Sequence, residues 1–148
     1  MSLQIPRSID DVWTIATTSV ICVWGARVAG LLLPQGTISF LTHAYYGFEA
    51  DYHDFPFGIQ LDAIHAVTHM MWGAAGLYIG FFRTSWAVPY MVLFGVYYVT
   101  LSFFGTFTEY HFGLSLGERE NTAHWTLGSL GLVTGLYGLW LQRREATP

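Results

Sequence analysis

The chain has 148 residues, of which 53% are hydrophobic, 18% are aromatic and only 11% are charged. Soluble domains carry about 25% charged residues, so this composition is typical of a small integral membrane protein with one domain. The net charge is −4 and all six basic residues are arginine, which leaves no basic patch for nucleic acid.

The first hydrophobic segment is predicted to cross the membrane as a helix from about residue 12 to residue 33. About 20 residues at 1.5 Å each cover a hydrocarbon core of about 30 Å. We expect this helix to stop at Pro34. Arg27 precedes that proline by seven residues. Its guanidinium group either snorkels to the headgroups at this end or forms an interior ion pair.

Residues 34–61 are predicted to form a long, aromatic, extracytoplasmic loop between the first two helices. The loop contains three acidic residues and no basic residue. Its aromatic side chains suit a belt at the headgroup level or a lid over the helix ends. The spacing of Ile38, Leu41 and Tyr45 is helical, which also allows an interfacial helix within the loop.

Three further spans are expected at about residues 62–82, 86–108 and 122–141, which completes an all-α bundle of four transmembrane helices. Four of the six arginines fall on one side of this arrangement: Arg7, Arg83, Arg143 and Arg144. The acidic connections fall on the other side. The positive-inside tendency then predicts cytoplasmic termini, and we expect a bacterial inner membrane.

The second and fourth hydrophobic segments share the pattern H-x3-G-x2-G-L-x2-G, which begins at His69 in one and at His124 in the other. Both segments run from outside to inside, so we predict a parallel internal repeat of residues 12–82 and 86–141. Glycines on one stripe of each helix would let the second and fourth spans approach each other closely. These packing glycines are Gly73, Gly76, Gly80, Gly128, Gly131 and Gly135.

Histidines gather where the predicted spans begin or end on the outer side. His65 and His69 are four residues apart and can direct two imidazoles to one ion. His124 occupies the matching place in the fourth span, so we expect these three to converge near the outer surface. His111 is a further candidate ligand. The polar residues expected around the histidines are Asp62, Glu109 and Asn121, with Asp62 and Asn121 as helix N-caps.

The residues alone leave several roles open for this cluster. Three histidines with nearby carboxylates suit a transition metal, and one axial histidine from each of two helices suits a haem. An inert hydrogen-bonded network or a path for protons or solutes between the helices would use the same residues. We find no catalytic triad, phosphate loop or zincin glutamate, so a hydrolytic enzyme is not expected.

The histidine pattern resembles that of an uncharacterised family of small four-span bacterial membrane proteins, known only as a domain of unknown function. The matching residues are His65, His69 and Gly73 in the second span, and Asn121, His124 and Gly128 in the fourth. Ala66 departs from the family, which often has asparagine there, and the loop of residues 34–61 is more elaborate. The resemblance covers about residues 58–140 and implies the four-span architecture, but it implies no activity.

The composition also bears on partners. Six Trp, nine Tyr and eleven Phe residues suit contact with lipid, with a pigment or with partner helices. The first functional expectation is therefore a scaffold or accessory subunit of a larger membrane complex, or of a homo-oligomer. A metal- or haem-binding membrane protein is the alternative, and a small transporter or proton path is the third possibility.

Overall fold

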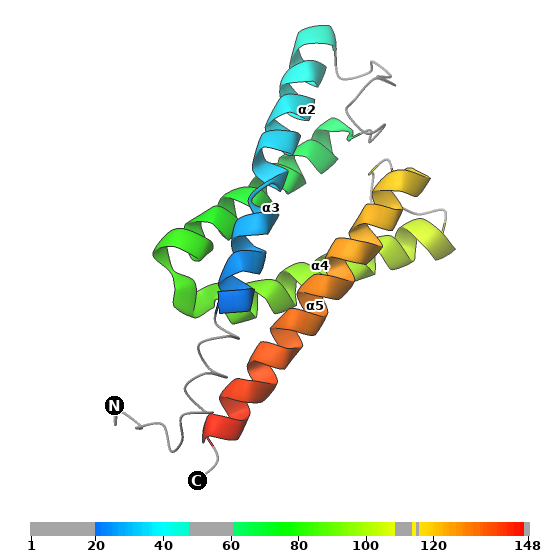
Figure 1. The fold of residues 1–148 in the computed structure, drawn as a ribbon. Helices are drawn as coiled ribbons and strands as arrows, with labels where there is room; N and C mark the ends of the chain where they lie inside the picture. The colour runs from blue at the N-terminus through cyan, green and yellow to red at the C-terminus, as the bar shows by residue number, and fades with distance from the viewer. Residues whose placement is uncertain (1–19, 48–60, 109–113, 115, 147–148) are drawn as a thin grey trace.

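The computed structural model describes residues 20–47, 61–108, 114 and 116–146. These residues form helices joined by turns, without a strand among them, which confirms the predicted all-α class. In Figure 1 the helix of residues 20–29 and α2 (Leu32–Tyr46) run along α3 (Ala63–Phe82). The short turn η2 (Thr84–Trp86) leads into α4 (Ala87–Phe107), which runs along α5 (Glu118–Ala146). We call the end where α3 and α5 begin the outer end, and the end where they finish the inner end.

The sequence predicted that the first helix stops at Pro34, but the chain is helical on both sides of this proline. Proline lacks the N–H that would bond the carbonyl of Gly30, so the helix is interrupted for one turn at residues 30–31. There the N–H of Leu33 donates to the carbonyl of Gly30 at 3.0 Å, in a tighter turn. Helical structure then resumes, because Pro34 lies in the first turn of α2, where its missing N–H is tolerated.

Much of the predicted loop is therefore helix. α2 continues to Tyr46 and ends at Gly47, whose φ of 107° is a conformation that favours glycine. Ile38, Leu41 and Tyr45 lie on the exposed face of this helix, as their spacing predicted. The rest of that loop, residues 48–60, lies outside the described residues, and so does the predicted start of the first span.

Two of the described helical stretches are long and apolar enough to cross a membrane, judged by length and composition. They are Val20–Tyr46, with 27 residues, and Thr84–Phe107, with 24 residues. The helix α3 has 20 residues and α5 has 29, but neither meets the same criterion of length and apolarity. Both carry many glycine and polar residues.

The glycine stripe of α3 packs against both the first helix and α2. A side-chain carbon added to Gly73 would strike the backbone of Leu33, and one added to Gly80 would meet Arg27. The two backbones can approach this closely only because these positions lack a side chain. The stripe is thus an interface within one helical hairpin.

The glycine stripe of α5 packs in the same way against α4. A side-chain carbon on Gly128 would meet the backbone of Val99, and one on Gly135 would meet that of Val92. Each stripe therefore faces its own hairpin partner, and the backbones of α3 and α5 approach each other in few places. The expectation that the second and fourth spans pack through their glycines is wrong, because the hairpin partners occupy both stripes.

The two hairpins join in a core toward the inner end. A side-chain carbon on Gly25 would overlap the side chain of Met91 in α4. The buried thiol of Cys22 donates to the carbonyl of Thr134 in α5 at 3.6 Å. The first helix therefore packs against both α4 and α5, and it fixes how one hairpin lies on the other.

We predict that Gly76→Leu and Gly131→Leu each destabilise the protein by about 1–3 kcal/mol through overpacking. A side-chain carbon on Gly76 would overlap the hydroxyl of Tyr90, and one on Gly131 would press on Gly95 and Phe94. Thermal unfolding in detergent measures the effect. Ala74→Leu is the matched control, because Ala74 lies on the exposed side of α3. Equal melting temperatures for all three variants would contradict close packing at the stripes.

Candidate metal centre

The beginning of α3 is fixed by a side-chain cap. Asp62 has extended backbone geometry, and its Oδ1 accepts a hydrogen bond from the backbone N–H of His65 at 2.8 Å. Such a cap satisfies one of the N–H groups that a helix start leaves unbonded. The predicted N-cap is confirmed, and it places His65 in the first turn of α3 and His69 in the second.

The prediction that Asn121 is the N-cap of the last helix is wrong. The helix α5 begins earlier, at Glu118, and the backbone N–H of Asn121 donates to the carbonyl of Gly117 at 2.9 Å. Acidic residues in the first turn, Glu118 and Glu120, favour this earlier start through the helix dipole. The amide of Asn121 instead donates to the hydroxyl of Thr106 in α4 at 2.7 Å.

Three histidines converge between the hairpins, as predicted. One ring nitrogen from each of His65, His69 and His124 lies within 4.8 Å of the others. The Nε2 atoms of His65 and His124 are 3.2 Å apart, across the gap between α3 and α5. The three side chains are only 0%, 3% and 2% exposed, so the cluster is buried inside the protein and does not lie on its surface. We call these residues the histidine trio.

The orientation of His69 is set by Gln35, which the sequence analysis did not identify. The ring nitrogen Nδ1 of His69 lies 3.2 Å from the amide oxygen of Gln35, and an amide oxygen only accepts. His69 therefore carries its proton on Nδ1 and has a lone pair on Nε2. That Nε2 is buried and has no hydrogen-bond partner among the described residues. Gly36 allows this contact, because a side chain there would strike the backbone of Ala66.

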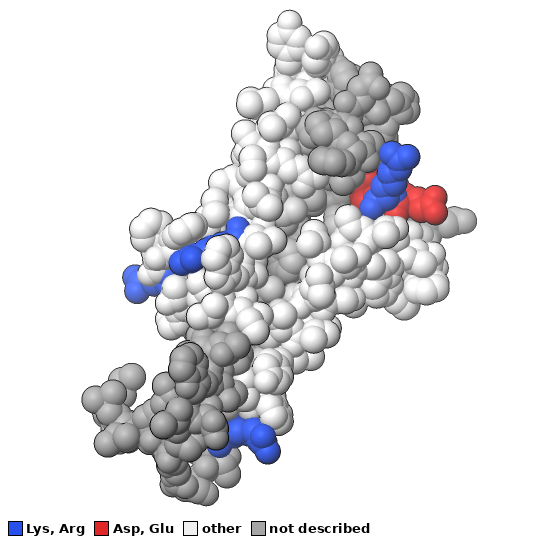
Figure 2. Space-filling view, viewed as in Figure 1, with Lys and Arg blue, Asp and Glu red and all other residues white. Residues whose placement is uncertain are grey.

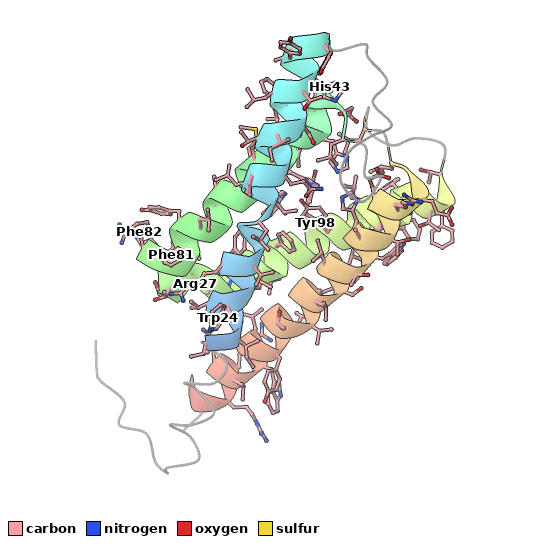
Figure 3. The ribbon with its side chains drawn as sticks, turned by 45° about the horizontal axis from the view of Figure 1, so that its top comes forward. Trp24, Arg27, His43, Phe81, Phe82 and Tyr98 are labelled. Carbon is pink, nitrogen blue, oxygen red and sulfur yellow. The ribbon has the colours of Figure 1, made fainter. Side chains whose placement is uncertain are left out.

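Tyr98 forms one wall of the trio and was also missed. It is fully buried, and its ring centroid lies 5.0 Å from that of His124 and 6.0 Å from that of His69. Figure 3 shows Tyr98 between the two hairpins. Its hydroxyl has no hydrogen-bond partner among the described residues. Tyr98 shares a helical face with Gly95 and Ser102, which are also buried, and that spacing is the signal in the sequence for its position.

The other predicted site residues lie elsewhere or outside the described part. His111 and Glu109 fall within residues that the structure does not describe. Asp62 caps the backbone at the start of α3. His43 lies farther along α2, where its Nε2 is 2.6 Å from the carbonyl of Leu61, and it is not a member of the trio.

The geometry of the trio is close to that of a metal-ligand set. A point equidistant from three atoms at most 4.8 Å apart lies within about 2.8 Å of each, so small side-chain rotations would reach a zinc–nitrogen distance of about 2.0–2.1 Å. Nitrogens bound tetrahedrally to one ion are about 3.3–3.4 Å apart. The 3.2 Å between the two Nε2 atoms fits that spacing, and it also fits a long N–H···N hydrogen bond.

Comparison of the chain with protein-family models, with curated proteins and with solved structures gives no match. The role of the trio must therefore be inferred from its own chemistry.

We predict that Asp62→Ala destabilises the protein by about 1 kcal/mol, because the N–H of His65 loses its acceptor. Asp62→Asn is the matched control, since asparagine caps helices about as well as aspartate. Thermal unfolding of both variants in the same detergent gives the comparison. A melting temperature that falls equally in the two variants would assign the effect to the lost charge, and the cap would not be its cause.

Proposed function

We propose that this chain is a small integral membrane protein that holds a transition-metal ion on His65, His69 and His124. The observation that carries the proposal is the burial of three imidazoles from two hairpins with their ring nitrogens within 4.8 Å. A buried nitrogen without a partner costs about 1–3 kcal/mol. An ion bound at Nε2 of His69 would remove that cost.

The orienting bond from His69 to Gln35 supports the same proposal. Histidines that bind metals usually donate their second ring N–H to an oxygen acceptor, which fixes the tautomer and the ring orientation. Gln35 supplies such an oxygen at 3.2 Å from Nδ1. Neutral imidazoles suit Zn, Cu, Fe and Ni more than Mg or Ca, so we propose an ion of the first group.

A haem fits the trio less well than a single ion. Two axial nitrogens on a haem iron lie about 4 Å apart, on opposite faces of a wide planar ring. The Nε2 atoms of His65 and His124 are only 3.2 Å apart, and the ring of Tyr98 packs 5.0 Å from that of His124. A macrocycle would have to displace these side chains.

Exposure of apolar side chains supports insertion of all four helices in a bilayer. The polar and glycine stripes of α3 and α5 face inward, whereas their outward faces carry large apolar residues. Met71 and Phe81 on α3 are 68% and 58% exposed, and Leu130 and Val133 on α5 are 60% and 66% exposed. Water-soluble monomers rarely expose such continuous apolar surface. The resemblance to a four-span family also supports the insertion of four helices.

The charge distribution supports cytoplasmic termini. Four of the described arginines belong to the inner end: Arg27, Arg83, Arg143 and Arg144. The acidic residues at the start of α5, with Arg119, belong to the outer end, and Figure 2 shows acidic side chains gathered away from the other arginines. By the positive-inside tendency the inner end faces the cytoplasm. The scaffold and transport roles remain predictions, because lipid alone would also cover the exposed aromatic faces.

We predict that the purified protein binds one Co²⁺ or Zn²⁺ per chain, with Co²⁺ giving the visible absorption of a nitrogen-ligated ion. His65→Ala, His69→Ala and His124→Ala should each weaken binding by more than about 100-fold, because each removes a direct ligand. Titration of Co²⁺ against absorbance gives the affinities. His43→Ala is the matched control, since His43 lies outside the trio.

Wild-type protein that shows neither absorbance nor bound metal would mean that the trio is a structural hydrogen-bonded network. An equal loss of affinity in His43→Ala would also contradict the assignment, because it would show that binding depends on a histidine outside the trio.

We also predict that Gln35→Ala weakens metal binding by about 10–100-fold while leaving the ligands in place, because His69 loses its orienting acceptor. Gln35→Glu retains an acceptor and should bind nearly as well as the wild type. Gln142→Ala, at an exposed position near the end of α5, is the control for a change in glutamine content. Unaltered affinity for the metal ion in Gln35→Ala would show that Gln35 does not orient His69.

A further inference from the structure

A second cluster of side chains lies at the inner end, away from the histidine trio. It consists of two arginines and the aromatic side chains beside them: Arg27, Arg83, Trp24, Phe81 and Phe82. We call it the inner arginine cluster. Figure 3 shows its labelled members gathered on the flank formed by residues 20–29 and α3.

The position of Arg27 is fixed by α3. Its Nε donates to the carbonyl of Gly80 at 2.9 Å, and its aliphatic stem crosses α3 where Gly80 has no side chain. A side-chain carbon at that position would overlap Cγ of Arg27. The guanidinium group is therefore carried on a stem that α3 already holds in place.

Aromatic rings hold the guanidinium group from two sides. It lies 4.5 Å from the ring centroid of Phe81 and 5.7 Å from that of Trp24, within the range of cation–π attraction. These rings are 58% and 59% exposed, so they also present apolar surface outward. The cluster thus combines a fixed cation with an apolar border.

The depth of Arg27 differs from the sequence expectation. That expectation placed it near the headgroups at the outer end, or in an interior ion pair. Because the first helix continues past Pro34, Arg27 lies beside Gly80, two residues before α3 ends at Phe82. That is about 3 Å along the helix axis. The guanidinium group is therefore at the level expected for headgroups of the inner leaflet.

A second cation lies next to the first, and the carboxylates among the described side chains lie at the outer end. Arg83 follows α3 directly, is exposed, and has its Nε 3.4 Å from the hydroxyl of Tyr78. Among the described side chains the carboxylates are those of Asp62, Glu118 and Glu120, all at the outer end. Within the described part of the chain the cluster is therefore a site of positive charge that calls for an anion.

We propose that the inner arginine cluster binds the phosphate group of an anionic phospholipid, with Trp24, Phe81 and Phe82 against its glycerol and acyl chains. This inference rests on the membrane insertion proposed above and is independent of the metal. The planar guanidinium group offers paired N–H donors that match phosphate oxygens. The exposed rings favour a lipid over free phosphate, because a small hydrophilic anion gains nothing from an apolar border.

Native mass spectrometry of the protein in detergent tests the proposal, with dioleoylphosphatidylglycerol and dioleoylphosphatidylcholine as probes. Wild-type protein should retain the first lipid at a concentration at least about fivefold lower than the second, since each arginine near an anionic surface contributes about that factor. Arg27→Gln and Arg83→Gln should each reduce this preference by about fivefold. Arg83→Gln keeps the test valid if Arg27→Gln does not fold, because Arg83 is exposed.

Arg144→Gln is the matched control. Arg144 also belongs to the inner end and lies 4.4 Å from the ring centroid of Trp140, but it is exposed at the end of α5. The substitution Arg144→Gln should leave the preference for the anionic lipid unchanged. Equal retention of both lipids by the wild type, or an equal loss in Arg144→Gln, would overturn the proposal.

Two further measurements separate the possible failures. Displacement of the lipid by millimolar glycerol 3-phosphate would make a free phosphate the ligand and would also overturn the proposal. Co²⁺ titration of Arg83→Gln should give the same affinity as that of the wild type. The proposed lipid site and the proposed metal site can therefore be refuted independently of each other.

Discussion

The close approach of each glycine-bearing helix to its hairpin partner is the constraint on which the rest of the structure depends. Where a side-chain carbon on Gly36 would strike Ala66, and one on Gly73 would strike Leu33, no layer of side chains separates the helices. Helices in lipid gain little from burying apolar surface, so contact of this kind supplies much of their association. It also fixes the rotation of α3, which turns its histidines inward and its large apolar residues outward.

The physical chemistry of the trio follows from that rotation. Three imidazoles buried together cannot all carry a charge, and each neutral ring has one donor and one acceptor to satisfy. Gln35 satisfies the donor of His69, and His65 and His124 face each other through Nε2. The hydrogen bonds described for the trio leave the lone pair of His69 unused, and Nδ1 of His124 also lacks a partner among the described residues. A cation bound at Nε2 of His69 would satisfy that lone pair, and this is the basis on which we propose a metal ion for the trio.

The sequence predicted the parts of this arrangement that depend on local rules. The N-cap at Asp62, the shared face of His65 and His69, and the partner His124 follow from capping and helical periodicity. The spacing of Ile38, Leu41 and Tyr45 also indicated a helix within the predicted loop after Pro34, where α2 lies. These predictions needed only residues within one or two turns of each other, or a motif that occurs twice.

The remaining features depend on contacts between distant segments. Pro34 predicts a helix end and therefore a loop at Gln35, whereas a single tighter turn at Gly30 lets the helix continue. The depth of Arg27 was misplaced for the same reason. Asn121 looked like a cap because the earlier start at Glu118 has no apolar residue to mark it. Tyr98 shares a helical face with Gly95 and Ser102, but that spacing does not indicate which side chains of other helices it contacts.

The small contact between α3 and α5 has a mechanical consequence. Toward the inner end the hairpins are joined by the first helix, through Cys22 and Gly25. At the trio the described link between α3 and α5 is the pair His65 and His124. Between these two places Trp72 of α3 packs on Phe94 and Tyr98 of α4, and its carbonyl accepts a hydrogen bond from the hydroxyl of Tyr90 at 2.9 Å. An ion held by the histidine trio would add a link between α3 and α5 beyond these contacts, so the chemistry of one buried site would bear on how the outer ends of the two hairpins lie.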